Sequence, residues 1–250
     1  KAFYNCSSLE NIIIPEGVTI IGDNAFRSCL DLASVTLPNT VTTIGNYAFC
    51  GCSITDIVLP DSLTTIGDSA FSFTDIKELT YPKNLTSIGV EPFSDTELAK
   101  LIIPDGVTTI LNGAFKNCKY LSNITWAKTL TTIGDNAFEG CRSLTELALP
   151  DSLTTIGSYA FSKCINLTEL TLSYGLTTIG SYAFSDCSAL TEIIIPDSVT
   201  KVGGFVFIRC SSLTDVTLPE NLKTISISDF RDCTSLESIR IPKNVTYISE

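Results

Sequence analysis

The sequence predicts a solenoid, a stack of similar supersecondary units, rather than one closed globule. Phenylalanine recurs along the whole chain at steps of 22 or 23 residues, at Phe3, Phe26, Phe49, Phe71, Phe93, Phe115, Phe138, Phe161, Phe184, Phe207 and Phe230. A period this regular is typical of a repeat array in which each unit contacts only its neighbours. We therefore predict a right-handed coil of about ten units of 22–23 residues.

The first element of each unit is predicted to be a strand. One clean unit reads LTELALPDSLTTIGSYAFSKC, and its opening LxxLxLP pattern alternates apolar and polar positions. A period of two is typical of a strand with one buried face, so Leu147 and Leu149 should point inward and Glu146 and Ala148 outward. The proline that follows cannot donate a ladder hydrogen bond and ends the strand.

Two shorter elements complete the unit. Residues 153–156 alternate again and are rich in β-branched side chains, which predicts a second short strand on another side of the coil. Gly157 then permits a tight turn. The next seven residues predict one helical or 3₁₀ turn, with Ala160, Phe161 and Cys164 directed inward by their spacing. Stacked units should thus form a parallel β-sheet on one face, with short extended or 3₁₀ segments elsewhere.

The sequence of LxLP, then IG, then AFxxC at 23-residue spacing resembles the BspA-like (Treponema pallidum-type) leucine-rich repeat family. The resemblance covers the whole chain and implies a single leucine-rich repeat solenoid domain over residues 1–250. It also implies a cell-surface or secreted protein that takes part in adhesion. Because the pattern starts and stops in mid-repeat without a polar capping repeat, we expect a fragment of a longer array.

Composition narrows the functional classes. The net charge of −11 disfavours nucleic acid as a partner, because phosphate binding needs clustered cations. The chain contains no histidine, the side chain best suited to acid–base chemistry at neutral pH and the commonest metal ligand. No apolar stretch approaches the roughly 20 residues of a membrane span. We predict no catalytic residue, no metal site, no cofactor, no membrane insertion by this segment, and a monomer.

The ten cysteines are predicted to be free thiols. Nine occupy the AFxxC position, where Thr74 and Thr96 also occur, whereas Cys50 directly follows Phe49. Strands of neighbouring units should lie about 4.8 Å apart, a distance that allows a disulfide. However, side chains in register point in parallel instead of toward each other. No CxxC pair supports a metal site. We expect buried thiols that act as small hydrophobes, with Cys50 more exposed.

The outward strand positions form the predicted binding surface. Four consecutive units carry a carboxylate at the third position of LxxLxLP, and neighbouring like charges destabilise a sheet unless a cation or basic ligand relieves them. This stripe is a docking strip for a basic partner, a weak Ca²⁺ site, or a solvated face copied by repeat duplication. The fifth position adds a semi-apolar row. Leucine-rich repeats usually bind through this face, so the predicted partner-binding residues are Glu78, Lys100, Asn123, Glu146, Glu169, Glu192, Asp215, Thr125, Thr171, Ile194 and Thr217.

Several residues interrupt the repeat. Tyr81, Trp126 and Tyr174 break the strand and turn patterns, and Trp126 occupies an inward position that favours core packing. Ser226 and Ser249 replace the glycine of the IG pair. Recurrent Thr-Thr pairs in the second strand suggest either cross-rung hydroxyl pairing or, less simply, an ice-binding array.

The predicted function is a non-enzymatic protein-interaction or adhesion module. Its predicted partner is a host matrix protein or a microbial surface protein, and its predicted location is extracellular or at the cell surface. A structural spacer that presents another domain explains the same repeat array.

Overall fold

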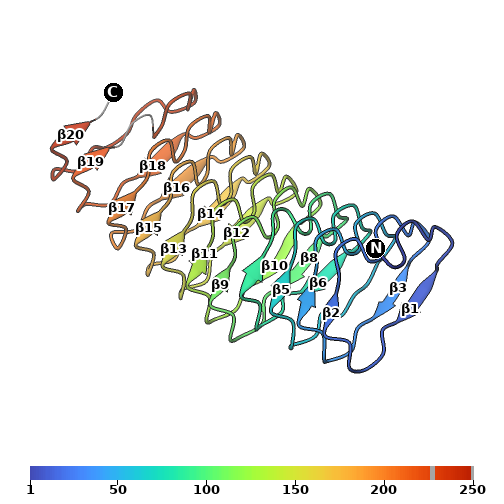
Figure 1. The fold of residues 1–250 in the computed structure, drawn as a ribbon. Helices are drawn as coiled ribbons and strands as arrows, with labels where there is room; N and C mark the ends of the chain where they lie inside the picture. Colours follow the sequence, from blue (N-terminus) through green and yellow to red (C-terminus); the bar gives the residue numbers. More distant parts are fainter. Residues whose placement is uncertain (226–228, 249–250) are drawn as a thin grey trace. The chain divides into compact units, whose positions relative to one another are not determined.

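The computed structural model describes residues 1–225 and 229–248, so that Ser226 and Ser249 lie outside the described residues. The chain divides into two compact units. Unit 1 comprises Lys1–Val107 and Leu111–Ala127, and unit 2 comprises Thr108–Ile110 and Lys128–Glu250. Within each unit the chain winds into a parallel-strand β-solenoid of repeats of 22 or 23 residues, and the described residues form no helix (Figure 1). The predicted fold class is confirmed.

Unit 1 contains two rows of short parallel strands. The LxxLxLP segments form the first row, with β1 (Asn11–Ile13), β3 (Ser34–Thr36), β6 (Glu78–Thr80), β8 (Lys100–Ile102) and β10 (Asn123–Thr125). The segments before the IG pair form the second row, with β2 (Ile20–Ile21), β4 (Thr43–Ile44), β5 (Thr65–Ile66) and β7 (Ser87–Ile88). Strands pair in parallel with the equivalent strand of the next coil, as Leu79 does with Leu101.

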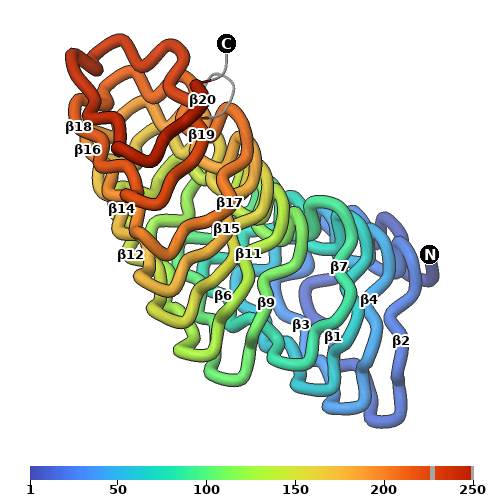
Figure 2. Tube along the Cα trace, turned by 90° about the vertical axis from the view of Figure 1, so that its left-hand side faces the viewer, coloured from blue at the N-terminus to red at the C-terminus, as the bar shows by residue number. Residues whose placement is uncertain are grey.

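Unit 2 repeats this arrangement. Its first row consists of β12 (Glu146–Ala148), β14 (Glu169–Thr171), β16 (Glu192–Ile194) and β18 (Asp215–Thr217). Its second row consists of β9 (Thr109–Ile110), β11 (Thr132–Ile133), β13 (Thr155–Ile156), β15 (Thr178–Ile179) and β17 (Lys201–Val202), followed by the pair β19 (Thr224–Ile225) and β20 (Tyr247–Ile248). Figure 2 shows successive coils of each unit following one another in chain order. We call the outward face of the first row the sheet side.

The core of each coil is filled by the same side chains. Leu147 and Leu149 are buried, while Glu146 and Ala148 on the same strand are exposed, as the period of two predicts. The phenylalanine rings stack face to face from coil to coil. Phe161 lies parallel to Phe184 with ring centroids 5.6 Å apart and an interplanar angle of 2°. In this stack, the rings from Phe26 to Phe207 are buried, and their burial is a large apolar contribution to stability.

The segment after the IG pair forms turns instead of the predicted helical or 3₁₀ turn. We call the face made by these segments the turn side. Tyr159 and Lys163 have φ values of 57° and 62°, in the left-handed region, which a right-handed helix does not allow. Their N–H groups donate to the carbonyl oxygens of Ser181 and Ser185 in the next coil, at 2.9 and 2.8 Å. Hydrogen bonds between coils therefore replace those of a helix. The predicted inward residues are all buried: Ala160, Phe161 and Cys164.

The glycine of the IG pair is required by the close approach of the preceding coil. A Cβ atom at Gly157 would lie 2.6 Å from both the backbone nitrogen and Oδ1 of Asp135. That carboxylate accepts the N–H of Ser158 at 2.7 Å, which holds the two coils together. At Gly22 an added Cβ meets no atom within 4 Å. The need for glycine thus arises from stacking.

The cysteines are free thiols, and eight of the ten are buried. In successive coils of unit 2, the thiols of Cys187 and Cys210 donate to the carbonyl oxygens of Phe161 and Phe184, at 3.4 and 3.3 Å. Burial raises the pKa of Cys164 to about 12, so this thiol stays neutral and unreactive near pH 7. The predicted buried thiols are confirmed.

Two cysteines differ from the rest. Cys50 is half-buried, in line with its predicted position apart from the others, and Cys6 is exposed, which its place in the repeat did not predict.

Candidate functional site

The sheet side of unit 2 brings the predicted carboxylates into register. Glu146 of β12 lies beside Glu169 of β14, and Glu192 of β16 lies beside Asp215 of β18. All four are exposed, because alternate residues of each strand point away from the core. Parallel pairing in register places equal charges side by side, which costs free energy in the isolated protein.

None of these four carboxylates forms an ion pair with another described residue. The outward residues beside them are Thr171, Ile194 and Thr217, and the side chain of Ile194 is 66% exposed. Unit 2 therefore presents a negative stripe, formed by Glu146, Glu169, Glu192 and Asp215, next to a semi-apolar row. We call these four residues the carboxylate stripe.

The remaining predicted site residues lie on the sheet side of unit 1. Lys100 on β8 donates to Glu78 on the neighbouring strand β6 at 2.7 Å. Asn123 and Thr125 on β10 are exposed and uncharged. The one carboxylate that the prediction assigned to unit 1 is therefore neutralised within the sheet.

On the turn side, carboxylates are paired with cations of the adjacent coil. The guanidinium of Arg209 donates to both carboxylate oxygens of Asp186, at 2.6 and 2.9 Å. Lys163 donates to the buried Glu139 at 2.7 Å. In unit 1, a hydrogen bond from Lys119 is the main reason why the pKa of Asp95 lies below its usual value. Cations of the adjacent coil therefore neutralise these turn-side carboxylates, whereas no cation among the described residues pairs with the carboxylate stripe.

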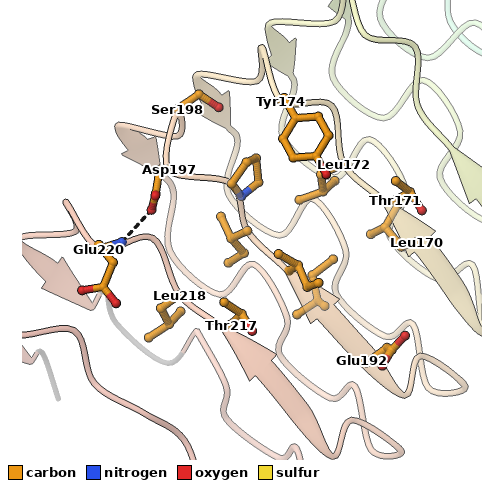
Figure 3. A pocket seen from close by; sticks show the side chains of 14 residues that line it. Leu170, Thr171, Leu172, Tyr174, Glu192, Asp197, Ser198, Thr217, Leu218 and Glu220 are labelled. Carbon is orange, nitrogen blue, oxygen red and sulfur yellow. Dashed lines mark hydrogen bonds between the residues drawn. The ribbon is translucent and has the colours of Figure 1, made fainter.

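A groove of about 530 Å³ lies on unit 2 over β14, β16 and β18 (Figure 3). Thr171, Ile194 and Thr217 line it on the sheet side. The turns after the strands contribute Tyr174 and Glu220. The groove thus extends the predicted surface beyond the strands to the turns that follow them.

Sequence reasoning missed the turn residues of this groove. It singled out Tyr174 as a break in the pattern but assigned it no role, and it did not consider Asp197 or Glu220. Tyr174 is 86% exposed. Asp197 and Glu220 each directly follow the strand-ending proline, and Tyr174 follows Ser173, which replaces that proline. The position directly after the strand-ending proline was the feature of the sequence that could have identified these turn residues.

Two other residues that interrupt the repeat are buried or half-buried and do not line the groove. Tyr81 is 1% exposed and packs against Phe115 with ring centroids 5.9 Å apart. Trp126, expected in the core, is half-buried.

The Thr-Thr pairs bond to backbone rather than to each other across the coils. Thr154 donates through Oγ1 to the carbonyl oxygen of Thr131 at 3.1 Å, and Thr177 does the same to Thr154 at 3.0 Å. These hydroxyls contribute to stacking of the coils.

No group of three or more His, Cys, Asp or Glu side chains is arranged to hold a metal ion within residues 1–225 and 229–248. No helix in the same part of the chain is long and apolar enough to cross a membrane.

The family model for the BspA type leucine-rich repeat region, which has six copies, matches residues 1–122, 89–207 and 131–250. The chain belongs to this BspA-type leucine-rich repeat family. Proteins of leucine-rich repeat families are in general non-enzymatic scaffolds that typically bind other proteins. No curated protein matches the chain.

Solved structures of bacterial leucine-rich repeat proteins have the same fold. One from Bacteroides ovatus is 28% identical, with a TM-score of 0.65, and the match covers 100% of this chain and 74% of that one. One from Eubacterium ventriosum is 26% identical, with a TM-score of 0.57, over 96% of this chain and 81% of that one. The Treponema pallidum leucine-rich repeat protein is 28% identical, with a TM-score of 0.56, over 60% of this chain and 73% of that one.

Proposed function

We propose that this BspA-type repeat chain is a non-enzymatic adhesion module of a cell-surface or secreted protein. It binds a protein on a host or microbial surface through the sheet side of unit 2. The observation that carries the proposal is the carboxylate stripe, whose four residues are exposed and form no ion pair with any residue that the structure describes.

Electrostatics supports a basic partner. Repulsion between Glu146 and Glu169, and between Glu192 and Asp215, raises the free energy of the unbound protein. A partner that places lysine or arginine side chains over the stripe removes this repulsion and adds favourable charge pairs. Complementary charge also steers the encounter and selects against acidic proteins.

The scaffold supports the same function. Stacked coils hold outward side chains at a spacing of about 4.8 Å, so little conformational entropy is lost when a partner binds. Repeat arrays use such extended surfaces for binding. The extracellular location rests on the resemblance to adhesion proteins of this family.

Surface plasmon resonance against purified host matrix proteins and microbial surface proteins tests the proposal. We expect saturable binding to at least one of them, weakened by salt because charge pairs are screened. The double variant Glu169→Lys/Glu192→Lys should lose at least about tenfold in affinity.

The matched control is Glu16→Lys/Asp31→Lys, which makes the same charge change at exposed positions of unit 1 that do not belong to the carboxylate stripe. Equal losses in the two double variants would contradict a sheet-side site. If the wild-type chain binds none of the proteins, the adhesion proposal fails, and the spacer interpretation accounts for the array.

A further inference from the structure

The groove on unit 2 is bounded by the sheet on one side and by the turns after the strands on the other. Thr171, Ile194 and Thr217 stand in a row on three adjacent strands and form its sheet-side part. The turns after these strands carry Tyr174 and Asp197, which form its other margin (Figure 3). An occupant that lies along the row therefore contacts the flat sheet on one side and the turns on the other.

Apolar side chains offer an anchoring point in the groove. Among the residues that line the groove, Tyr174 is 86% exposed and Ile194 is 66% exposed. Leu172 and Ile195 also line it but belong to the core, with 6% and 4% exposure. Covering an exposed aromatic ring and an exposed β-branched side chain is favourable, because apolar surface leaves water. Aromatic residues in such positions often dominate binding energy.

The margins of the groove carry negative charge. Glu192 lies on the sheet side, whereas Asp197 and Glu220 lie in the turns, and no lysine or arginine is among the lining residues. The side chain of Asp197 is held in place by the N–H of Glu220, which donates to it at 2.8 Å. Arg240 pairs with Glu220 at 2.7 Å. Glu192 and Asp197 form no ion pair with a described residue, so each margin keeps one carboxylate without an ion-pair partner among them.

We propose that this groove binds an extended, basic segment of the partner protein. An apolar side chain of the segment packs against Tyr174 and Ile194, while neighbouring lysine or arginine side chains reach Glu192 and Asp197. The inference rests on the proposed function, and it names the chemistry that the sheet side of unit 2 selects. Charge complementarity excludes an acidic segment, and the apolar anchor distinguishes the site from a purely electrostatic surface.

An extended segment suits the groove for a geometric reason. Successive side chains of a strand-like segment are about 3.3 Å apart along the chain and point to opposite sides. Apolar and basic residues of the segment can therefore contact different parts of the groove. The long aliphatic stems of lysine and arginine lie along apolar surface while their charged ends reach the carboxylates.

The test uses a fluorescein-labelled nine-residue peptide that alternates lysine and valine, with leucine at its central apolar position, and measures fluorescence anisotropy. A matched peptide keeps every lysine and replaces the apolar residues with serine. We expect the apolar peptide to bind the intact chain at least about tenfold more tightly than the serine peptide. Tyr174→Ala should weaken binding of the apolar peptide by about tenfold, and Glu192→Gln by about threefold.

Tyr120→Ala is the matched control, because Tyr120 is 60% exposed in unit 1 and outside the groove. It should leave the affinity unchanged. Tyr174→Phe should retain binding, which separates loss of the ring from loss of the hydroxyl. Thermal denaturation of each variant checks that the fold persists.

Three outcomes overturn the inference: no binding of the apolar peptide, equal binding of the serine peptide, or unchanged affinity in Tyr174→Ala. The proposed function fails independently. If a surface protein binds in a manner that depends on Glu169 and Glu192 while Tyr174→Ala has no effect, the groove is wrong and the adhesion surface stands. If no surface protein binds at all, the proposed function fails as well.

Discussion

The turn side and the sheet side of unit 2 treat charge in opposite ways, although the same coils build both. On the turn side Asp186 receives two hydrogen bonds from Arg209, and Glu139 receives one from Lys163. On the sheet side Glu169 and Glu192 lie among other carboxylates and form no ion pair with a described residue. Ion pairs between coils thus form on the turn side of unit 2, whereas the carboxylate stripe has none with a described residue.

Packing differs between the two faces in the same sense. The turn side contributes the stacked phenylalanines and the buried thiols to the core. The sheet side carries exposed side chains such as Glu192 and Ile194. We therefore expect substitutions on the turn side to act on stability and substitutions on the sheet side to act on binding.

The largest effect is expected from Phe161→Ala on the turn side. Phe161 is fully buried between Phe138 and Phe184, with ring centroids 5.3 and 5.6 Å away. Removing the ring leaves a cavity, so the free energy of unfolding should fall by about 3–5 kcal/mol. Urea denaturation measures this. Phe3→Ala is the control, because Phe3 is 42% exposed and should lose much less. Similar losses at both positions would contradict a stabilising role of the buried phenylalanine rings.

Gly157→Ala should have the next largest effect. The new Cβ would lie 2.6 Å from the backbone of the preceding coil, which must move away. We expect a loss of about 1–3 kcal/mol in the free energy of unfolding, measured by the same denaturation. Gly22→Ala adds the same methyl group where no atom lies within 4 Å and should be nearly neutral. A neutral Gly157→Ala would contradict the close approach of the coils.

The buried thiols predict a loss of stability in alkali. Burial raises the pKa of Cys164 from 9.0 to about 12. A pKa that is higher in the folded state stabilises fully below pH 9, and this contribution is lost as the pH rises toward 12. Cys164→Thr removes one such group, and Thr74 and Thr96 already occupy the same position in other coils.

Between pH 8 and pH 10, the wild-type chain should therefore lose about 1 kcal/mol more than Cys164→Thr in the free energy of unfolding. Thermal denaturation at the two pH values measures the difference. Equal losses in both proteins would mean that Cys164 does not resist ionisation.

The smallest expected effect has opposite signs on the two faces. Glu169→Gln relieves repulsion from Glu146 and should raise the free energy of unfolding by roughly 0.2–1 kcal/mol at low salt. Asp186→Asn weakens the bonds to Arg209 and should lower it by roughly 0.2–1 kcal/mol, since this pair is partly exposed. Denaturation at low and high salt measures both changes, and salt should shrink each. Changes of the same sign would remove the distinction between the faces.

The sequence predicted the core well and the turn side poorly, for a physical reason. Every coil must fill the same interior, so the period of phenylalanine and the alternation around Leu147 are visible in the residues themselves. The left-handed backbone at Tyr159 and Lys163 is imposed by hydrogen bonds to the next coil. Neither residue is glycine, so nothing local indicated that conformation.

The candidate site, too, could be predicted from the sequence only in part. Alternation along each strand sufficed to place Glu169 and Glu192 outward. The groove depends on how three successive turns project beside the strands, and Tyr174 and Asp197 belong to turns whose residues vary from coil to coil. That three-dimensional arrangement was not available from the pattern of one unit.

Carboxylate footprinting tests the central claim most directly. Carbodiimide and glycine ethyl ester label accessible carboxylates, and mass spectrometry compares the free chain with its complex with the surface protein that binds it. We predict that labelling of Glu169, Glu192 and Asp215 falls strongly in the complex while labelling of Glu16 and Asp31 does not change. Protection confined to carboxylates outside the carboxylate stripe would contradict a partner-binding surface on the sheet side of unit 2.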